Sequence, residues 1–166
     1  IANTFTGSTS PIAFVGCVDC AALNNTIVNP ARWIIRILQE TVTGGGFTFS
    51  PAQNGRFLNN LVYFARGTIS TYVNVGANTS APSFVFGNNL WYAHDMPGSS
   101  RPTDLPSTEM GAVVGVDPLL TNMTGGDYTL RAMSPAIGAG RAATELRADL
   151  AGRCYASPPS IGAYER

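Results

Sequence analysis

The segment Leu23-Asn24-Asn25-Thr26-Ile27-Val28 has two further copies within the first ninety-odd residues of this 166-residue chain. They are Leu58-Asn59-Asn60-Leu61-Val62-Tyr63 and Gly87-Asn88-Asn89-Leu90-Trp91-Tyr92. Each copy couples a pair of asparagines to a short apolar strand, and the copies lie about thirty residues apart. This spacing is expected when three short strands and their loops form one turn of a solenoid. The repeat therefore predicts an all-β fold built from stacked coils.

Paired asparagines suit the sharp bend between two strands of such a coil. Asparagine tolerates left-handed backbone angles, and its side chain forms hydrogen bonds with nearby backbone. When the bend recurs in successive coils, the amides stack and satisfy one another inside an apolar interior. The alternation of Leu23, Asn25 and Ile27 places the second asparagine of each pair on the inward side. The predicted ladder comprises Asn25, Asn60 and Asn89.

The segment from residue 29 to residue 40, NPARWIIRILQE, fits two kinds of structure. Asn29 as a cap and Pro30 at the first position form a good helix start. Trp33, Ile35 and Ile37 alternate equally well as a strand, and β-branched residues favour that reading. We predict a strand because the surrounding repeat is made of strands. The stretch from 143 to 152 is predicted to be a loop, with one helical turn as the alternative.

The C-terminal third carries five ordered segments with a recognisable succession. They are Asp117-Pro118-Leu119-Leu120, Asp127-Tyr128-Thr129-Leu130, Ser134-Pro135-Ala136-Ile137-Gly138-Ala139-Gly140, Asp149-Leu150-Ala151-Gly152-Arg153 and Ile161-Gly162-Ala163-Tyr164-Glu165. This succession resembles the closing tail of bacterial secreted right-handed parallel β-helix proteins, the pectate-lyase-like solenoids. An asparagine ladder also characterises that family.

The resemblance implies an all-β, right-handed single-stranded parallel β-helix, represented by its last coils and an irregular C-terminal tail. Residues 1–100 would form coils with the asparagine ladder, and residues 101–166 the closing coil and tail of the same domain. It also implies a secreted or cell-surface location. Polysaccharide is the ligand class that the resemblance suggests.

Composition excludes several kinds of partner. Charged residues make up 12% of the chain and balance to a formal net charge of zero, so no basic patch invites nucleic acid. No run of eighteen apolar residues is present, and we expect no membrane span. A solenoid that starts in mid-coil exposes strand edges. We therefore expect preceding coils or another chain to cover the N-terminal end, with Ile1 to Phe14 as the contact surface.

The cysteines do not predict a metal site. Cys17 and Cys20 have the CxxC spacing, but the second pair that a zinc site needs is absent, and the single histidine, His94, is distant in sequence. A disulfide or simple packing of small residues are the two alternatives for the cysteines, which include Cys154. We expect no metal and no cofactor.

Catalytic groups are not evident in this part of the chain. The resemblance implies a lyase mechanism with lysine or arginine as the base, but the chain contains no lysine. Glycoside hydrolysis needs two facing carboxyl groups, and Asp19, Glu40 and Asp95 fall at different offsets from their asparagine pairs. We expect a binding or structural protein. The alternative is the C-terminal portion of a polysaccharide lyase or glycoside hydrolase with catalytic coils upstream or on a partner chain.

Outward-facing residues supply candidates for carbohydrate binding. Val28, Tyr63 and Tyr92 occupy equivalent positions and should stack about 4.8 Å apart. Exposed aromatic rings pack against sugar rings, and arginine can hold a uronate carboxylate. The candidate binding residues are Tyr63, Tyr92, Arg36, His94, Asp95 and Arg101. The alternatives are an aromatic stack that only stabilises the solenoid or lies beneath a loop, and a loop histidine after the final regular coil. Trp91 is predicted to be in the core.

Overall fold

The computed structural model describes residues 1–166 and contains β-strands and two short 3-10 turns, with no α-helix. Three parallel sheets form the body of the molecule. The first sheet has the strands β1 (Thr4–Thr6), β4 (Thr26–Val28), β9 (Leu61–Phe64), β12 (Leu90–Ala93) and β13 (Val113–Val114). The second has β2 (Ile12–Val15), β5 (Ile35–Leu38) and β10 (Val73–Val75). The third has β3 (Ala21–Leu23), β8 (Arg56–Leu58) and β11 (Val85–Gly87).

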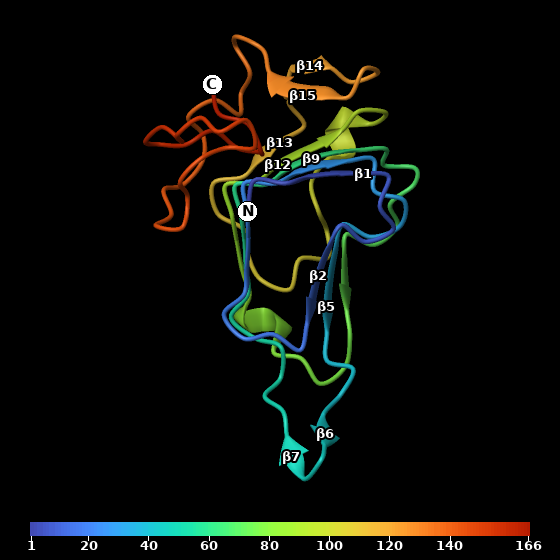
Figure 1. Ribbon diagram of the computed structural model, residues 1–166. Helices are drawn as coiled ribbons and strands as arrows, with labels where there is room; N and C mark the ends of the chain where they lie inside the picture. Colours follow the sequence, from blue (N-terminus) through green and yellow to red (C-terminus); the bar gives the residue numbers. More distant parts are fainter.

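The chain visits the three sheets in turn and then starts a new coil beside the previous one. Thus β1, β2 and β3 form one coil, β4, β5 and β8 the next, and β9, β10 and β11 the third. Every pairing between coils is parallel. Figure 1 looks along the stack, and the coils superimpose as a three-sided outline. Crossover connections between parallel strands are right-handed, and the fold is a right-handed parallel β-helix.

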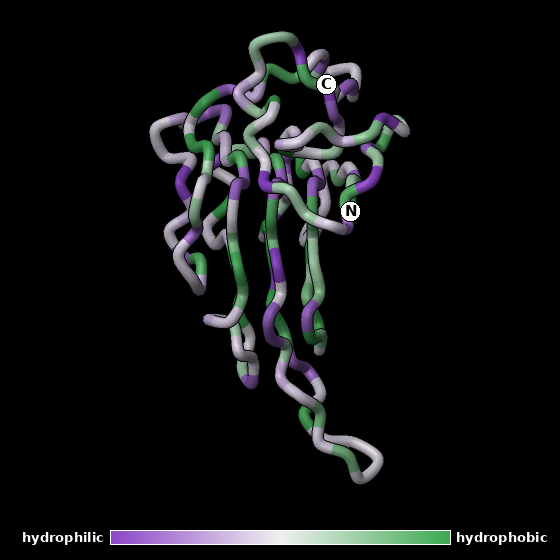
Figure 2. The backbone as a smooth tube through the Cα atoms, turned by 90° about the vertical axis from the view of Figure 1, so that its left-hand side faces the viewer, coloured by the Kyte–Doolittle hydropathy of each residue, from purple (hydrophilic) through white to green (hydrophobic).

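The remaining elements lie outside this body. The 3-10 turns are η1 (Ala81–Ser83) and η2 (Pro97–Ser99), and two antiparallel hairpins are formed by β6 (Thr43–Gly44) with β7 (Phe47–Thr48) and by β14 (Leu120–Asn122) with β15 (Asp127–Leu130). Figures 1 and 2 show the β6–β7 hairpin projecting from the coils, away from the C-terminal tail. No helix has the length and apolar character required to cross a membrane.

Side chains in register fill the interior of the coils. Ile27, Val62 and Trp91 face one another across β4, β9 and β12, and all three are fully buried. The ring of Trp91 stacks on Phe57 from the third sheet, with centroids 5.9 Å apart. Burial of each such large side chain stabilises the fold by about 1.5–3 kcal/mol. The prediction that Trp91 belongs to the core is confirmed.

The second asparagine of each pair points inward and joins the next coil. Asn25 Nδ2 donates to Asn60 Oδ1 at 2.8 Å, and Asn60 Nδ2 donates to Asn89 Oδ1 at 3.1 Å. The backbone N–H groups of Asn25 and Asn60 donate to the same oxygens. The three predicted residues thus form one buried row of amides. Two members were missed: Asn3 precedes the row by donating to Asn25 Oδ1, and Glu109 follows it by accepting from Asn89 Nδ2.

The first asparagine of each pair has a different task. Asn24, Asn59 and Asn88 have φ angles of 50°, 57° and 50°, in the left-handed region that the sharp bend requires. Their side chains point away from the core interior and bind the backbone of the C-terminal tail. Asn24 Nδ2 donates to Ser160 O, Asn59 Nδ2 to Arg141 O and Asn88 Nδ2 to Ala139 O. Each pair therefore joins the coils to one another and to the tail.

The tail covers the outer face of the first sheet. Figure 1 places the β14–β15 hairpin and the C-terminal segment next to β9, β12 and β13. A second hydrophobic core lies between them, formed by Val28, Leu61, Leu90, Leu120, Tyr128, Leu130, Ala136 and Ile161. Burial of these side chains, which come from both the coils and the tail, holds the tail in place.

Two buried carboxylates organise the tail segments that resemble the family's closing tail. Asp149 accepts hydrogen bonds from the backbone N–H groups of Ala151, Arg153 and Glu165. Glu165 in turn accepts from the backbone of Ser160 and Ala156. A carboxylate can satisfy several N–H groups in a segment without regular secondary structure. These contacts explain why Asp149 and Glu165 occur in an otherwise irregular tail.

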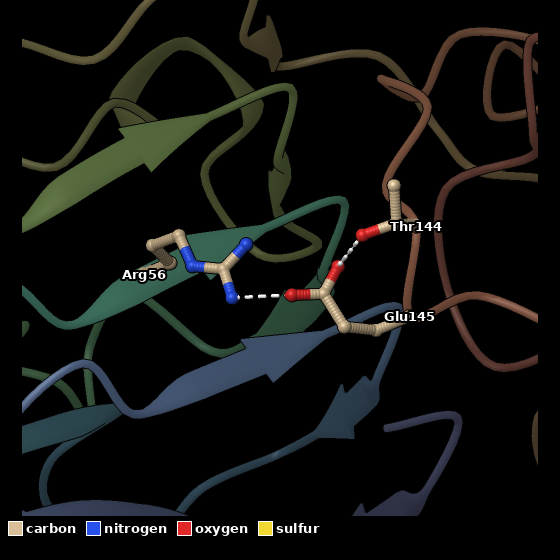
Figure 3. A network of polar contacts seen from close by, with 3 residues as sticks. All are labelled: Arg56, Thr144 and Glu145. Atoms are coloured by element: carbon tan, nitrogen blue, oxygen red, sulfur yellow. Dashed lines mark hydrogen bonds and ion pairs between the residues drawn. The ribbon is translucent and has the colours of Figure 1, made fainter.

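A single ion pair joins the tail to the third sheet. Figure 3 shows the guanidinium of Arg56, on β8, against the carboxylate of Glu145, which also accepts from the hydroxyl of Thr144. It is the one ion pair in the molecule. The pair is partly exposed, so solvent screening weakens its contribution.

One of two local predictions needs correction. Only Ile35–Leu38 of the segment 29–40 forms a strand, because residues 29–34 make the bend between the first and second sheets. Trp33 therefore lies outside the strand, and its alternation with Ile35 and Ile37 does not place it in the core. Residues 143–152 form a loop without a helix, as predicted.

Candidate functional site

The predicted aromatic row is present but does not form an open surface. The strand register aligns Val28 with Tyr63 and Tyr63 with Tyr92. The two tyrosine rings are 5.6 Å apart and tilted by 56°. Both are half-buried against the second hydrophobic core beneath the tail. Burial, and secondarily the Asp117 carboxylate, raises the pKa of both phenols. Of the two alternatives, the geometry favours a stack that lies beneath a loop.

His94 extends this row at its exposed edge. It follows β12, and its ring stacks on Tyr63 with centroids 4.9 Å apart and an interplanar angle of 17°. Its Nε2 lies 3.2 Å from Asn29 Oδ1, within hydrogen-bond distance. The structure thus brings Tyr63, Tyr92 and His94 together. His94 is the member of this group most accessible to a ligand.

Asp95, although exposed, is engaged by the backbone of the preceding coil. It accepts hydrogen bonds from the N–H groups of Arg66 at 2.6 Å and Gly67 at 3.1 Å. These two bonds lower the pKa of the carboxyl. The residue therefore stabilises a turn between coils. No second carboxyl group is hydrogen-bonded to Asp95.

Arg101 lies near the last member of the ladder. A cavity of about 190 Å³ is lined by Arg101, Thr103, Ser107 and Glu109, among others. Burial raises the pKa of Glu109, against the opposing effect of its hydrogen bonds from Asn89 and Trp91. No contact joins Arg101 to Arg36, so the two predicted arginines do not form one site.

Arg36 belongs to a different cluster, on the outer face of the second sheet. Its position in β5 is in register with Ala13 on β2 and Asn74 on β10. Arg36 Nε donates to Asn74 Oδ1 at 3.1 Å, and its guanidinium carbon lies 4.6 Å from the centre of the Trp33 ring. The guanidinium carbon of Arg32 lies 3.9 Å from the same centre. We refer to Arg32, Trp33, Arg36 and Asn74 as the Trp33–Arg36 surface.

The local fold explains how Trp33 comes to lie on the outside. The bend after β4 is attached to the first coil by backbone bonds from Ala31 to Ser8 and from Trp33 to Thr9. Ile34 then enters the core and is fully buried, so the side chain before it faces outward. Trp33 is left half-buried, with the two arginines beside its ring. Such cation–π contacts contribute about 0.5–1 kcal/mol each at exposed sites.

The electrostatics of this surface are unbalanced. Arg32 and Arg36 form no ion pair with any carboxylate. Asn74 occupies only the Nε of Arg36, and no protein acceptor is bonded to its two terminal nitrogens. A guanidinium in this state can hold a carboxylate through two parallel hydrogen bonds.

Metal and thiol chemistry have little support. The structure contains no group of three or more His, Cys, Asp or Glu side chains arranged to hold a metal ion. Cys17, Cys20 and Cys154 are free thiols. Burial is the main cause that raises the pKa of Cys17 to about 12, with a further effect of Cys20, so its thiolate form is disfavoured.

The sequence missed three of the four residues of the Trp33–Arg36 surface. The one available signal was the alternation of Trp33, Ile35 and Ile37, which was interpreted as a strand. Asn74 carried no signal, because its proximity to Arg36 depends on the register of β5 and β10.

Comparison with known proteins identifies no relative: no protein-family model matches the chain, and no curated protein sequence matches it.

Proposed function

We propose that this protein is a secreted or cell-surface β-helix of the pectate-lyase-like class that binds an acidic polysaccharide through the Trp33–Arg36 surface. One observation carries the proposal: two unpaired guanidinium groups flank one partly exposed indole ring. The tail covers the first sheet and reaches the third, but no tail contact involves the outer residues Arg36 and Asn74 of the second. The resemblance of the tail supports the same class.

The chemistry of the ligand follows from what the surface lacks. The positive charges of Arg32 and Arg36 have no carboxylate partner within the protein. A polymer with repeated carboxylates supplies such partners. Trp33 holds the two guanidinium groups close to each other through cation–π contacts. The surface contains no histidine, carboxylate or lysine that could act as a general base, which favours binding over catalysis.

We propose in addition that further coils of the same polypeptide cover the N-terminal end. A cavity of about 380 Å³ opens there, and most of the residues that line it are hydrophobic, among them Phe5, Ile12, Phe14 and Ala22. Asn3 Oδ1 accepts no hydrogen bond, whereas every other ladder oxygen accepts from the preceding coil. This open acceptor also favours a second candidate function, the C-terminal portion of a polysaccharide lyase or glycoside hydrolase with catalytic groups on those coils.

Calorimetric titration with polygalacturonate, alginate and a neutral glucan tests the binding proposal. We expect saturable binding of the two acidic polymers only. Trp33→Ala and Arg36→Gln should each weaken it by about tenfold or more, which corresponds to about 1.4 kcal/mol. Arg131→Gln, an exposed arginine of the tail, is the matched control and should bind normally. Equal affinity of Arg36→Gln and Arg131→Gln, or equal binding of the glucan, would contradict the proposal.

Ultraviolet absorbance of unsaturated products distinguishes the second candidate. A protein that includes the preceding coils should release such products from a polyuronate if it is a lyase. Residues 1–166 alone should bind without releasing them. Product release by residues 1–166 alone would show that this part of the chain does contain a catalytic base.

A further inference from the structure

One cavity of the molecule lies within the C-terminal tail. It has a volume of about 390 Å³ and separates the β14–β15 hairpin from the segments around Asp149 and Tyr164. This volume falls within the range of about 300–1,000 Å³ that is usual for small-molecule sites. We call it the tail pocket. The Trp33–Arg36 surface contributes none of its residues.

The carboxylates of the tail pocket are mostly occupied by hydrogen bonds from the protein itself. Asp149 accepts three backbone N–H groups, at 2.7–2.9 Å. Glu165 accepts the N–H groups of Ala156, Ser160 and Arg166 and the hydroxyl of Ser160. Both carboxylates are buried and hold the backbone together. Glu165 has no capacity left for a ligand hydroxyl group, and Asp149 has one lone-pair site free.

The hydrogen-bond donors of the pocket, in contrast, mostly have no acceptor within the protein. The Arg153 side chain makes no hydrogen bond and no ion pair, and the hydroxyl of Tyr164 makes no hydrogen bond. Arg166 uses one terminal nitrogen, Nη1, to donate to Leu130 O at 2.7 Å, and its other N–H groups have no protein acceptor. The pocket thus offers N–H and O–H donors and almost no free acceptor. Its complement is a ligand with an oxyanion.

The charge of the lining limits how negative that ligand can be. Arg153 and Arg166 supply two positive charges, and Asp149 and Glu165 supply two negative ones. Because the carboxylates lie in the same wall, a dianion such as phosphate meets more repulsion than a monoanion. The hydroxyls of Thr121 and Thr129 line the wall and can accept from ligand hydroxyl groups. Tyr164 adds an aromatic ring.

We propose that the tail pocket binds a single hydroxylated carboxylate of the size of one sugar-acid residue. Arg153 and Arg166 hold its carboxylate, the two threonine hydroxyls meet its hydroxyl groups, and the Tyr164 ring contacts its carbon skeleton. The proposal is independent of the Trp33–Arg36 surface, because a polymer on the second sheet does not occupy the pocket.

Calorimetry and ligand-observed NMR with galacturonate, glucuronate, glucose and inorganic phosphate test the proposal on residues 1–166. We expect saturable binding of the two sugar acids and none of glucose, with phosphate at least tenfold weaker. Arg153→Gln should weaken sugar-acid binding by tenfold or more, and Tyr164→Phe by a smaller factor. Arg131→Gln is the control for charge in the tail and should bind like the unaltered protein.

The fold should survive these changes, because only the backbone of Arg153, and not its side chain, bonds to Asp149. An unchanged thermal midpoint verifies this, and Thr129→Val provides a second variant. The proposal is overturned if no sugar acid binds, if glucose or phosphate binds as well, or if Arg153→Gln behaves like Arg131→Gln. Arg36→Gln must leave pocket binding unchanged, so failure here is distinguishable from failure of the polysaccharide surface.

Discussion

The side-chain amide of Asn89 donates to Oε1 of Glu109 at 2.6 Å, so the row of stacked amides ends on a carboxylate. The second oxygen, Oε2, accepts from Trp91 Nε1 at 2.8 Å. In the last coil the strand register places Gly111 and Ala112 opposite Asn88 and Asn89. Glu109 therefore supplies, from outside the repeat, the acceptor that a further asparagine would have provided.

Glu109→Gln should destabilise the fold by about 1–3 kcal/mol. The change replaces one carboxylate oxygen by an NH2 group, which would face the N–H donor of Asn89 or Trp91. The free energy of unfolding in urea measures this loss. Glu40→Gln is the control, since Glu40 is exposed and makes no hydrogen bond. Equal stability of the two variants would refute the role of Glu109 as an obligatory acceptor.

The stability of the protein should rise as the pH falls from 7 towards 4.5. Burial raises the folded-state pKa of Glu109 and Asp104 above their ordinary values of 4.5 and 3.8. At pH values between the ordinary and the raised pKa of each group, the folded protein binds more protons than the unfolded chain. Acidification therefore favours folding in this pH range. Asp95, Asp127 and Glu145 have lowered pKa values, and their contributions are lost only below their ordinary values. Urea midpoints measured from pH 7 to pH 3 should pass through a maximum.

Glu109→Gln provides the control for this pH dependence. The variant lacks one of the two carboxyl groups whose pKa is raised. Its gain in stability on acidification should therefore be smaller than that of the unaltered protein. An identical gain in both proteins would exclude Glu109 as a source.

Asn60→Asp should be among the most destabilising conservative changes. The amide of Asn60 donates to Ala22 O, Leu58 O and Asn89 Oδ1 inside the core, and an aspartate would place acceptors against all three. Loss of these bonds and burial of a charge should cost about 3 kcal/mol or more. Asn3→Asp, at the exposed end of the same row, should cost less. Thermal unfolding of both variants compares them directly.

Asn59→Gly tests the attachment of the tail without disturbing the bend, because glycine accepts the φ angle of 57°. The change removes the reciprocal pair in which Asn59 donates to Arg141 O and accepts from Arg141 N. We expect faster hydrogen exchange at the Arg141 amide and a loss of about 1–2 kcal/mol. Asn54→Gly, at an exposed residue with φ of 54°, is the matched control. Equal exchange in both variants would show that Asn59 does not secure the tail.

The sequence predicted those features that depend on periodicity. The recurring Asn-Asn pairs located the inward row and the alignment of Val28, Tyr63 and Tyr92, because each coil repeats the same bend. Asn3 and Glu109 escaped because neither belongs to an Asn-Asn pair. The covering of Tyr63 and Tyr92 also escaped prediction, since it depends on packing against a hairpin that lies more than fifty residues later for Tyr63.

The candidate site was less predictable than the fold for a related reason. Arg36 was identified from its charge, but its partners Trp33 and Asn74 become neighbours only through the bend at residues 29–34 and the pairing of β5 with β10. The free donors of Arg153 and Tyr164 likewise become evident only when every other polar group around them is accounted for.

The amide row has a direction, since every hydrogen bond between two of its side chains runs from a donor on one coil to an acceptor on the later coil. Toward the C-terminal tail the row ends on the Glu109 carboxylate, which accepts from Asn89 and Trp91. A carboxylate has no N–H group, so it cannot donate to the asparagine oxygen of a further coil in the way that Asn60 donates to Asn89. An additional coil stacked on this end would therefore leave its own ladder oxygen without a donor, which disfavours extension of the stack past Glu109.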